Sequence, residues 1–250
     1  MDGKSVFGPR AGYYMQSRPD YPTAVLTCLR DVYGLEETAV IADIGSGTGK
    51  LVRLFLANGN PVWGVEPDSD MRAASETYLR DFPGFTAVDG TAEATTLPNA
   101  SVDFVVAGQA AHWFDRVGAQ KEFGRIGRPG GKIVLVWNQR DRDTPLVQGF
   151  DHLVQTFRQT STELRRANAA PADVSALAGP QAELHTFPYG QELDFAGLAA
   201  RLMSISFMPL PGDPQHEALL AALQAFFAAH EVNGRVQLTY RTELYVGVLG

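Results

Sequence analysis

Cysteine is almost absent from this chain of 250 residues, with Cys28 as its single representative. One cysteine can form no internal disulfide bond, and it cannot supply the thiolate cluster of a structural metal site. The five histidines show no ligand spacing such as His-x-x-x-His. The sequence therefore predicts a protein without a bound metal ion.

Basic residues are outnumbered, because 21 lysines and arginines face 28 aspartates and glutamates, a formal net charge of -7. This balance argues against a nucleic acid or an anionic membrane as partner, since both attract a basic stripe. No apolar run approaches the roughly 20 residues of a membrane span. Residues 1–4 lack the basic start of a signal peptide. We expect a cytoplasmic protein, a monomer or a homodimer, that binds neither nucleic acid nor membrane.

Short β-rich runs alternate with longer helical patterns in the first half of the chain, which is typical of a parallel sheet covered by helices. The predicted strands are 39–44, 61–65, 85–88, 102–107 and 132–137. The predicted helices are 21–33, 48–58, 68–81 and 117–126. Three of these helices are followed by Gly34, Gly59 and Gly127, at positions where a helix end favours a left-handed residue.

The pattern changes after Trp137. Apolar residues at helical spacing predict a helix over 146–164, and a segment rich in alanine, proline and glycine follows over 167–180. A strand over 183–188, helices over 195–206 and 214–230, and a last strand over 235–249 are predicted next. Because no helix follows the last strand, we expect it to enter the sheet antiparallel to its neighbour.

The strongest local signal is a buried strand that runs into three glycines and then a helix, with the sequence ADIGSGTG over residues 42–49. Glycines let the backbone approach a ligand closely and take positive φ without steric cost. The next predicted strand ends in Glu66, at the position where an acid accepts hydrogen bonds from ribose hydroxyls. Since a residue at the end of a strand is not core, we expect Glu66 to serve the ligand and not the fold.

Asp43 narrows the choice of ligand. It stands directly before the loop where a dinucleotide would place its pyrophosphate, and a carboxylate there would repel the phosphates. The same carboxylate would suit the cationic amino group of a methionine moiety. The spacing G-x-G-x-G also differs from the G-x-G-x-x-G of dinucleotide sites and from a Walker loop.

Several segments together resemble a known family. The run 42–49 with Glu66 resembles motif I and the ribose acid of class I S-adenosylmethionine-dependent methyltransferases. Residues 90–93 and 97–103 resemble the adenine-side segment of that family, and 107–114 and 128–132 resemble its motifs at strands four and five. With the pattern Y-x-x-x-R-P-x-Y-P over 14–22, the resemblance is to the type 11 subgroup, and within it to trans-aconitate methyltransferase-like proteins. It covers residues 14–137.

The resemblance implies a Rossmann-like α/β fold, with a doubly wound, mostly parallel seven-stranded sheet, an antiparallel last strand and a helical lid. We expect a single domain over 1–250. Its predicted parts are an N-terminal helical cap (1–36), a cofactor-binding half (37–137), a helical lid insertion (138–181), and a C-terminal part that completes the sheet and adds helices (182–250).

The resemblance also assigns residues to S-adenosylmethionine. The predicted cofactor-binding residues are Arg18, Asp43, Gly45, Ser46, Gly47, Thr48, Gly49, Glu66, Pro67, Met71, Thr91, Ala92, Glu93 and Gln109. Asp43 and the loop would hold the methionine part, and Glu66 would take the ribose. Pro67 and Met71 would flank the adenine, while Thr91 and Ala92 would meet its edge. Arg18 would reach the methionine carboxylate; the alternative is an exposed arginine in an N-terminal arm. Thr91 stands where the subgroup often has an aspartate.

The acceptor side is expected at the carboxyl end of predicted strand four, where ligands of such sheets bind. His112 and, more weakly, Gln109 are the catalytic candidates, because an imidazole of ordinary pKa can remove a proton near neutrality. The alternative is that His112 only shapes the wall of the acceptor pocket, together with Tyr14 and Trp113. A base is optional, since alignment and desolvation can drive displacement from a sulfonium.

The acceptor is expected to be a small molecule. The run 108–111 lacks the Pro-Pro-aromatic motif of enzymes that methylate nucleic-acid bases, and no carboxylates stand where catechol-type enzymes bind metal. The resemblance favours a carboxylate, methylated on oxygen. Two other functions stay open: an NAD(P)-dependent oxidoreductase, and a protein that binds S-adenosylmethionine without catalysis.

Overall fold

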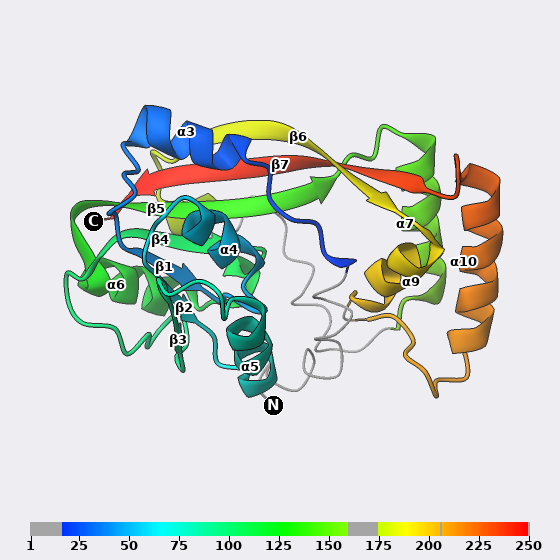
Figure 1. Cartoon of the computed structure of the whole chain (residues 1–250), viewed down its shortest axis with the longest axis horizontal. Coiled ribbons are helices and arrows are strands. Elements are labelled where there is room, and N and C mark those ends of the chain that lie inside the picture. Colours follow the sequence, from blue (N-terminus) through cyan, green and yellow to red (C-terminus); the bar gives the residue numbers. More distant parts are fainter. Residues whose placement is uncertain (1–16, 160–174, 206, 250) are drawn as a thin grey trace.

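The computed structural model describes residues 17–159, 175–205 and 207–249, and these residues form a seven-stranded sheet in the order β3-β2-β1-β4-β5-β7-β6 (Figure 1). The five parallel strands are β1 (Ile41–Ile44), β2 (Val62–Val65), β3 (Phe85–Val88), β4 (Val102–Gly108) and β5 (Gly127–Arg140). β7 (Val236–Val248) lies antiparallel between β5 and β6 (Glu183–Leu193). The mostly parallel sheet with an antiparallel last strand is confirmed.

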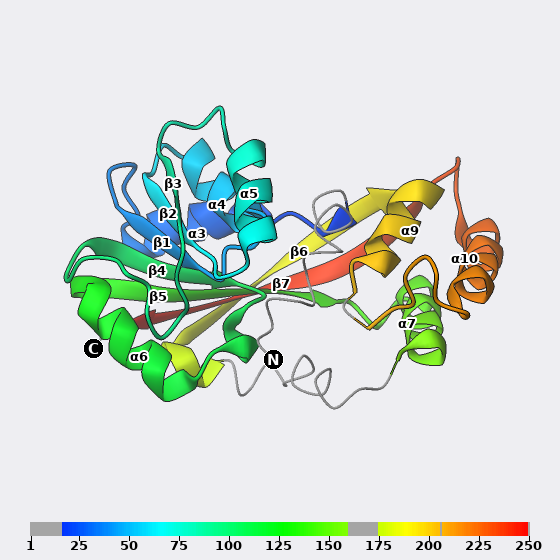
Figure 2. The ribbon, with the colours of Figure 1, turned by 90° about the horizontal axis from the view of Figure 1, so that it is seen from below.

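Helices cover both faces of the sheet, as Figure 2 shows. They are α3 (Ala24–Tyr33), α4 (Lys50–Ala57) and α5 (Ser69–Tyr78) on one face, and α6 (Arg116–Ile126) and the 3-10 helix η4 (Ala176–Ala178) on the other. Leu29 and Phe55 anchor the first layer, and Phe123 and Leu177 anchor the second. Because β1 is covered on both faces, all four of its side chains are buried. We call β1 to β5 with α3 to α6 the parallel half.

A second group of helices packs around the far ends of β6 and β7 (Figures 1 and 2). It consists of α7 (Pro145–Phe157), α9 (Phe195–Met203) and α10 (His216–His230). Their apolar sides enclose fully buried residues such as Phe150, Leu198 and Leu219, which meet Leu238 of β7. We call these three helices and the strand ends that they cover (189–193 and 236–240) the helical region.

Two strands are longer than the sequence predicts. β5 begins at Gly127, which pairs with Val102 of β4, and ends at Arg140, which pairs with Tyr240 of β7. β6 continues to Leu193 because it follows β7 to its far end at Val236. The prediction for Gly127 is wrong, since its φ of -70° leads straight from α6 into β5. Gly34 and Gly59 do take the left-handed conformation, with φ of 70° and 97°.

Some predictions fall outside the described residues. Tyr14, positions 160–164 of the predicted helix and most of the segment 167–180 are among them. The division of the domain into four parts stays a prediction, and β5 runs across its boundary at 137/138. No helix in the described ranges is long and apolar enough to cross a membrane.

Candidate cofactor and acceptor site

The glycine loop joins β1 to α4, and Gly45, Gly47 and Gly49 have φ of 66°, 55° and 86°. A β-carbon on Gly45 would lie 2.7 Å from that of Ala110, and one on Gly49 would lie 2.6 Å from Leu79. At Gly47, by contrast, no described atom lies within 4 Å of that position. Packing and backbone conformation therefore fix the loop, while Gly47 faces open space.

Asp43 is the second-to-last residue of β1, just before this loop, and its carboxylate is fully buried. Neither of its oxygens forms a hydrogen bond within the described part of the chain. Burial and then the nearby Glu66 raise the pKa of Asp43 well above its usual range. The backbone N–H of Val52 opposes this rise, but it makes no hydrogen bond of good geometry with the carboxylate. An isolated buried carboxylate is unfavourable, so this one is suited to a cationic partner.

Two hydroxyl groups of the loop are, like the Asp43 carboxylate, buried without a hydrogen-bond partner among the described residues. They are Ser46 Oγ and Thr48 Oγ1. Buried polar groups are normally paired, and exceptions of this kind call for a partner. Together with Asp43 and the open side of Gly47, they fit a ligand that brings its own polar groups to the loop.

Glu66 performs a structural task that the sequence did not reveal. Its Oε2 accepts a hydrogen bond from the N–H of Gly47 at 2.9 Å, and its Oε1 accepts one from the N–H of Asp68 at 2.9 Å. Burial raises the pKa of Glu66, and these two N–H groups lower it in part. The expectation that Glu66 serves only the ligand is wrong, because its carboxylate holds the glycine loop. Each oxygen keeps a second lone pair for a ribose hydroxyl.

The residues predicted beside the adenine follow β2 and β3. Pro67 is half-buried, and Met71 is buried in the first turn of α5. Thr91 exchanges backbone hydrogen bonds with Ala94, which forms a tight turn. Ala92 in that turn is buried. This turn presents the two predicted adenine contacts at the edge of the sheet.

Glu93, the next residue, points to a neighbouring element. Its side chain is exposed, and its carboxylate accepts a hydrogen bond from the N–H of Asp115 at 2.8 Å. Asp115 in turn caps the N-terminus of α6. The Glu93 side chain therefore ties the adenine-side turn to α6.

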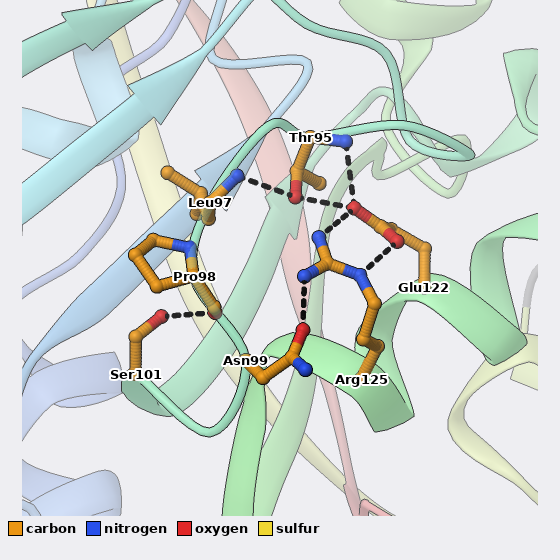
Figure 3. A network of polar contacts seen from close by, with 7 residues as sticks. All are labelled: Thr95, Leu97, Pro98, Asn99, Ser101, Glu122 and Arg125. Carbon is orange, nitrogen blue, oxygen red and sulfur yellow. Dashed lines mark hydrogen bonds and ion pairs between the residues drawn. The ribbon is translucent and has the colours of Figure 1, made fainter.

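A polar network, drawn in Figure 3, fixes the same loop further along through the buried residues Thr95 and Glu122. Glu122 of α6 accepts hydrogen bonds from the N–H of Thr95 (2.8 Å) and from its hydroxyl (2.6 Å). Arg125 donates to both oxygens of Glu122, at 2.6 and 2.8 Å, and to Asn99 at 2.6 Å. The hydrogen bond from Arg125 is the main reason that the pKa of Glu122 falls to about 2. Sequence reasoning missed this network, because its parts lie on different elements.

Gln109 follows β4 with φ of 58°, a left-handed conformation that non-glycine residues rarely adopt. Its side-chain Nε2 donates to the carbonyl of Asn138 at 3.1 Å, and its N–H donates to the carbonyl of Val136 at 3.0 Å. Strained backbone of this kind clusters at functional sites. Gln109 therefore stands, firmly held, at the carboxyl edge where the sequence places it.

His112 lies in the 3-10 helix η2 (Ala111–Trp113). The centroid of its ring is 5.0 Å from that of the Trp113 ring and 5.2 Å from that of the Trp137 ring. Its Nδ1 is buried and has no hydrogen-bond partner in the described ranges. Burial, and to a lesser extent Arg18, lower the pKa of His112 to about 4. The expectation of an ordinary histidine pKa is therefore wrong. The ring is neutral at pH 7 and is a weak base there.

Arg18 is half-buried, so the alternative of an exposed arm is wrong. Its Nη2 donates to the carbonyl of Ser204 at 3.1 Å, and the neighbouring Ser17 carbonyl accepts from Gln191 at 2.9 Å. The structure therefore brings Arg18 to His112 and to the end of α9. Tyr14, the other N-terminal candidate, lies outside the described residues.

Comparison with known proteins agrees with this geometry. Residues 42–135 match the model of a methyltransferase domain family, type 11. An uncharacterized methyltransferase of Schizosaccharomyces pombe is 34% identical over 146 residues, which are 58% of this chain and 57% of that protein. One of Mycobacterium bovis is 38% identical over 135 residues, 54% of this chain and 53% of that protein. The matches thus span little more than half the length of either relative.

A solved structure shares the fold over nearly the whole chain. This provisionally named type II methyltransferase from Anaeromyxobacter dehalogenans has a TM-score of 0.70 and 22% identity, and covers 93% of this chain and 98% of its own. This likeness shows that the chain has a Rossmann-like α/β fold. Residues 42–135 are similar to methyltransferase domains of the type 11 subgroup. The finer resemblance to trans-aconitate methyltransferase-like proteins stays a prediction.

Proposed function

We propose that this protein transfers the methyl group of S-adenosylmethionine to a carboxylate oxygen of a small molecule. The cofactor supplies a methyl group activated on a sulfonium. The observation that carries the proposal is the buried carboxylate of Asp43, whose oxygens make no hydrogen bond to any described residue. In the loop that follows, no described side chain fills the space beside Gly47. The cationic amino group of the cofactor is the partner that this carboxylate lacks.

The other residues around the loop would hold the rest of the cofactor. Ser46 and Thr48 offer hydroxyls to its polar groups, and Glu66 offers its remaining lone pairs to the ribose. Thr91 and Ala92 would contact the adenine edge. NAD(P) fits less well, because its phosphates would approach two buried acidic side chains, Asp43 and Glu66.

The choice of a carboxylate rests on His112. A general base works best when its pKa lies near the working pH, and burial holds the pKa of His112 at about 4. A carboxylic acid is already ionised at pH 7, so its methylation needs no base. His112 would then form an apolar wall with Trp113 and Trp137, and Gln109 would help to orient the acceptor. A cytoplasmic location and a monomeric or homodimeric state are part of this proposal.

Thermal shift with S-adenosylmethionine, S-adenosylhomocysteine, NAD and NADP tests the cofactor. A ligand of the folded state raises the melting point by RT ln(1 + [L]/Kd) in free energy, and we expect this only for the first two. Stabilisation by NAD or NADP alone would favour the oxidoreductase alternative.

Turnover is tested separately by the release of S-adenosylhomocysteine with a library of small carboxylic acids and their matched amides. We expect acids to be consumed and amides to be inert. Tight cofactor binding without turnover on any compound would favour the non-catalytic alternative.

A further inference from the structure

Arg201 of α9 is a buried cation with neutral partners. Only 3% of the residue is exposed. Its Nε donates to the hydroxyl of Tyr240 at 3.2 Å, and its Nη1 donates to the hydroxyl of Ser204 at 3.2 Å. No carboxylate within the described ranges forms an ion pair with it. Because an arginine is almost never fully buried unless it is paired, this guanidinium calls for an anionic partner.

The surroundings add positive charge. Arg140, at the end of β5, is paired with Asp151, but Asp151 also pairs with Arg142. Burial and then the charge of Arg201 lower the pKa of Arg140. The carboxylate of Asp151 therefore forms ion pairs with two arginines, Arg140 and Arg142, and none with Arg201. The cluster as a whole carries an excess of positive charge.

Contacts connect this cluster to the acceptor side of the site. The hydroxyl of Ser204 accepts from Arg201, and the carbonyl of Ser204 accepts from Arg18. Arg18 in turn lies near enough to His112 to lower its pKa. The positive charges of Arg18, beside the neutral ring of His112, and of Arg201 in α9 are thus linked through Ser204. Arg18 and Ser204 connect Arg201 to the acceptor side.

We propose that Arg201 binds an anionic oxygen group, a carboxylate or a phosphate, which the acceptor carries at a distance from the atom that is methylated. This inference rests on the proposed function, because it requires an acceptor that lies between His112 and α9. The planar guanidinium, held by Tyr240 and Ser204, is suited to the oxygens of such a group. Arg201 would then select acceptors with two polar ends over acceptors with one.

A structural role and a binding role predict opposite effects on stability. A buried cation without an anion is unfavourable for folding, so Arg201→Gln should leave the melting point of the ligand-free protein unchanged or raise it. If Arg201 were present mainly to hold Tyr240 and Ser204 together, the same substitution should lower it. A variant that melts lower or fails to fold overturns the inference.

Binding is measured by calorimetry in the presence of saturating S-adenosylhomocysteine, with glutarate, its neutral diamide glutaramide, and inorganic phosphate as probes. We expect the wild type to bind at least one anion and not glutaramide. Binding of glutarate alone identifies a carboxylate, and binding of phosphate alone identifies a phosphate. Arg201→Gln should weaken the bound anion roughly tenfold to hundredfold, and Arg201→Lys should lose less.

Arg241→Gln is the matched control, because Arg241 follows Tyr240 on β7 but has a side chain that is 59% exposed. It should bind the anion like the wild type. A wild type that binds S-adenosylhomocysteine but no anion, or an Arg201→Gln variant with unchanged anion affinity, overturns this inference alone. A wild type that does not bind S-adenosylhomocysteine overturns the proposed function and, with it, the inference.

Discussion

The parallel half and the helical region bury opposite charges. In the parallel half, Asp43 has a carboxylate that makes no hydrogen bond to the described chain, and Glu66 lies beside it. In the helical region, Arg201 is buried against two hydroxyls, near Arg140. Among the described residues, the buried acid Asp43 thus has no cationic partner in the parallel half, and the buried cation Arg201 has no anionic partner in the helical region. This difference underlies the two proposals, which place a cationic ligand group beside Asp43 and an anionic one beside Arg201.

The two regions also differ in what the comparisons say of them. The family match ends at residue 135, before α7, α9 and α10, so it covers the cofactor side only. The strands β5 and β7 nevertheless run through both regions, and the similar solved structure covers 93% of the chain. The shared sheet makes one fold of two regions whose chemistry has to be established separately.

The largest effects are expected for two buried phenylalanines, one in each region, and replacing them tests whether the two regions act separately. Phe123 of α6 is 1% exposed and Phe150 of α7 is 0% exposed. Either substitution to alanine should lower the free energy of unfolding by about 3–5 kcal/mol, measured with denaturant. Phe123→Ala should also weaken S-adenosylhomocysteine, because α6 carries Glu122 and its hold on the adenine-side loop. Phe150→Ala should not. Equal losses of affinity would show that the two regions do not act separately.

Glu66 gives the next largest effect. Glu66→Ala leaves the N–H groups of Gly47 and Asp68 without their acceptor, so the free energy of unfolding should fall by about 1–3 kcal/mol. Affinity for S-adenosylhomocysteine should fall by a further 1.5–3 kcal/mol or so, measured by calorimetry. Glu66→Gln, which keeps an oxygen acceptor, should recover part of the stability. A fully stable Glu66→Ala variant would show that the loop does not depend on this carboxylate.

Glu122 makes the parallel half sensitive to acid. Its pKa is about 2 in the folded protein, against 4.5 ordinarily, so its stabilisation is complete above about pH 4.5 and is lost as the pH falls toward 2. At pH 7, Glu122→Gln should cost about 1–2 kcal/mol in unfolding free energy. This difference from the wild type should shrink as unfolding is followed down to low pH. A difference that is constant with pH would contradict the ionised network of Figure 3.

His112 should show the smallest effect on rate. Because its pKa is about 4, the pH–rate profile should have no limb caused by this residue near pH 6.5. With an acceptor from the library, His112→Phe should raise KM by about tenfold and change kcat little, which is typical of lost binding. A fall in kcat of roughly a hundredfold or more, with loss of an acidic limb, would instead make His112 the base and argue against a carboxylate acceptor.

Local patterns explain what could be predicted. The strands and helices of the parallel half could be predicted from the periodicity of their apolar residues. The glycine loop could be predicted because its glycines and Asp43 lie in one continuous run, 42–49. The extension of β5 to Arg140 and of β6 to Leu193 could not be predicted. Both extensions depend on pairing with β7, which lies about a hundred residues from β5 and about fifty residues from β6 in the sequence. Gly127 shows the same limit, since the strand after it overrides the helix-end preference.

Most of the missed parts of the site depend on contacts between residues that are far apart in the sequence. Thr95 meets Glu122 from 27 positions away, and Arg201 meets Tyr240 from 39 positions away. The low pKa of His112 likewise depends on burial against Trp137 and on Arg18. No spacing of residues in the sequence predicts such contacts. They follow from the fold alone.

Asp43→Asn tests the central claim most directly, because it keeps the shape of the side chain and removes the charge proposed to bind the cofactor's amino group. Calorimetry compares S-adenosylhomocysteine with methylthioadenosine, which lacks that amino group. We expect affinity for S-adenosylhomocysteine to fall by roughly a hundredfold, and affinity for methylthioadenosine to change little. The ligand-free variant should melt no lower than the wild type, since a buried charge is removed. Equal losses for both ligands would contradict the account and leave Asp43 with a structural role only.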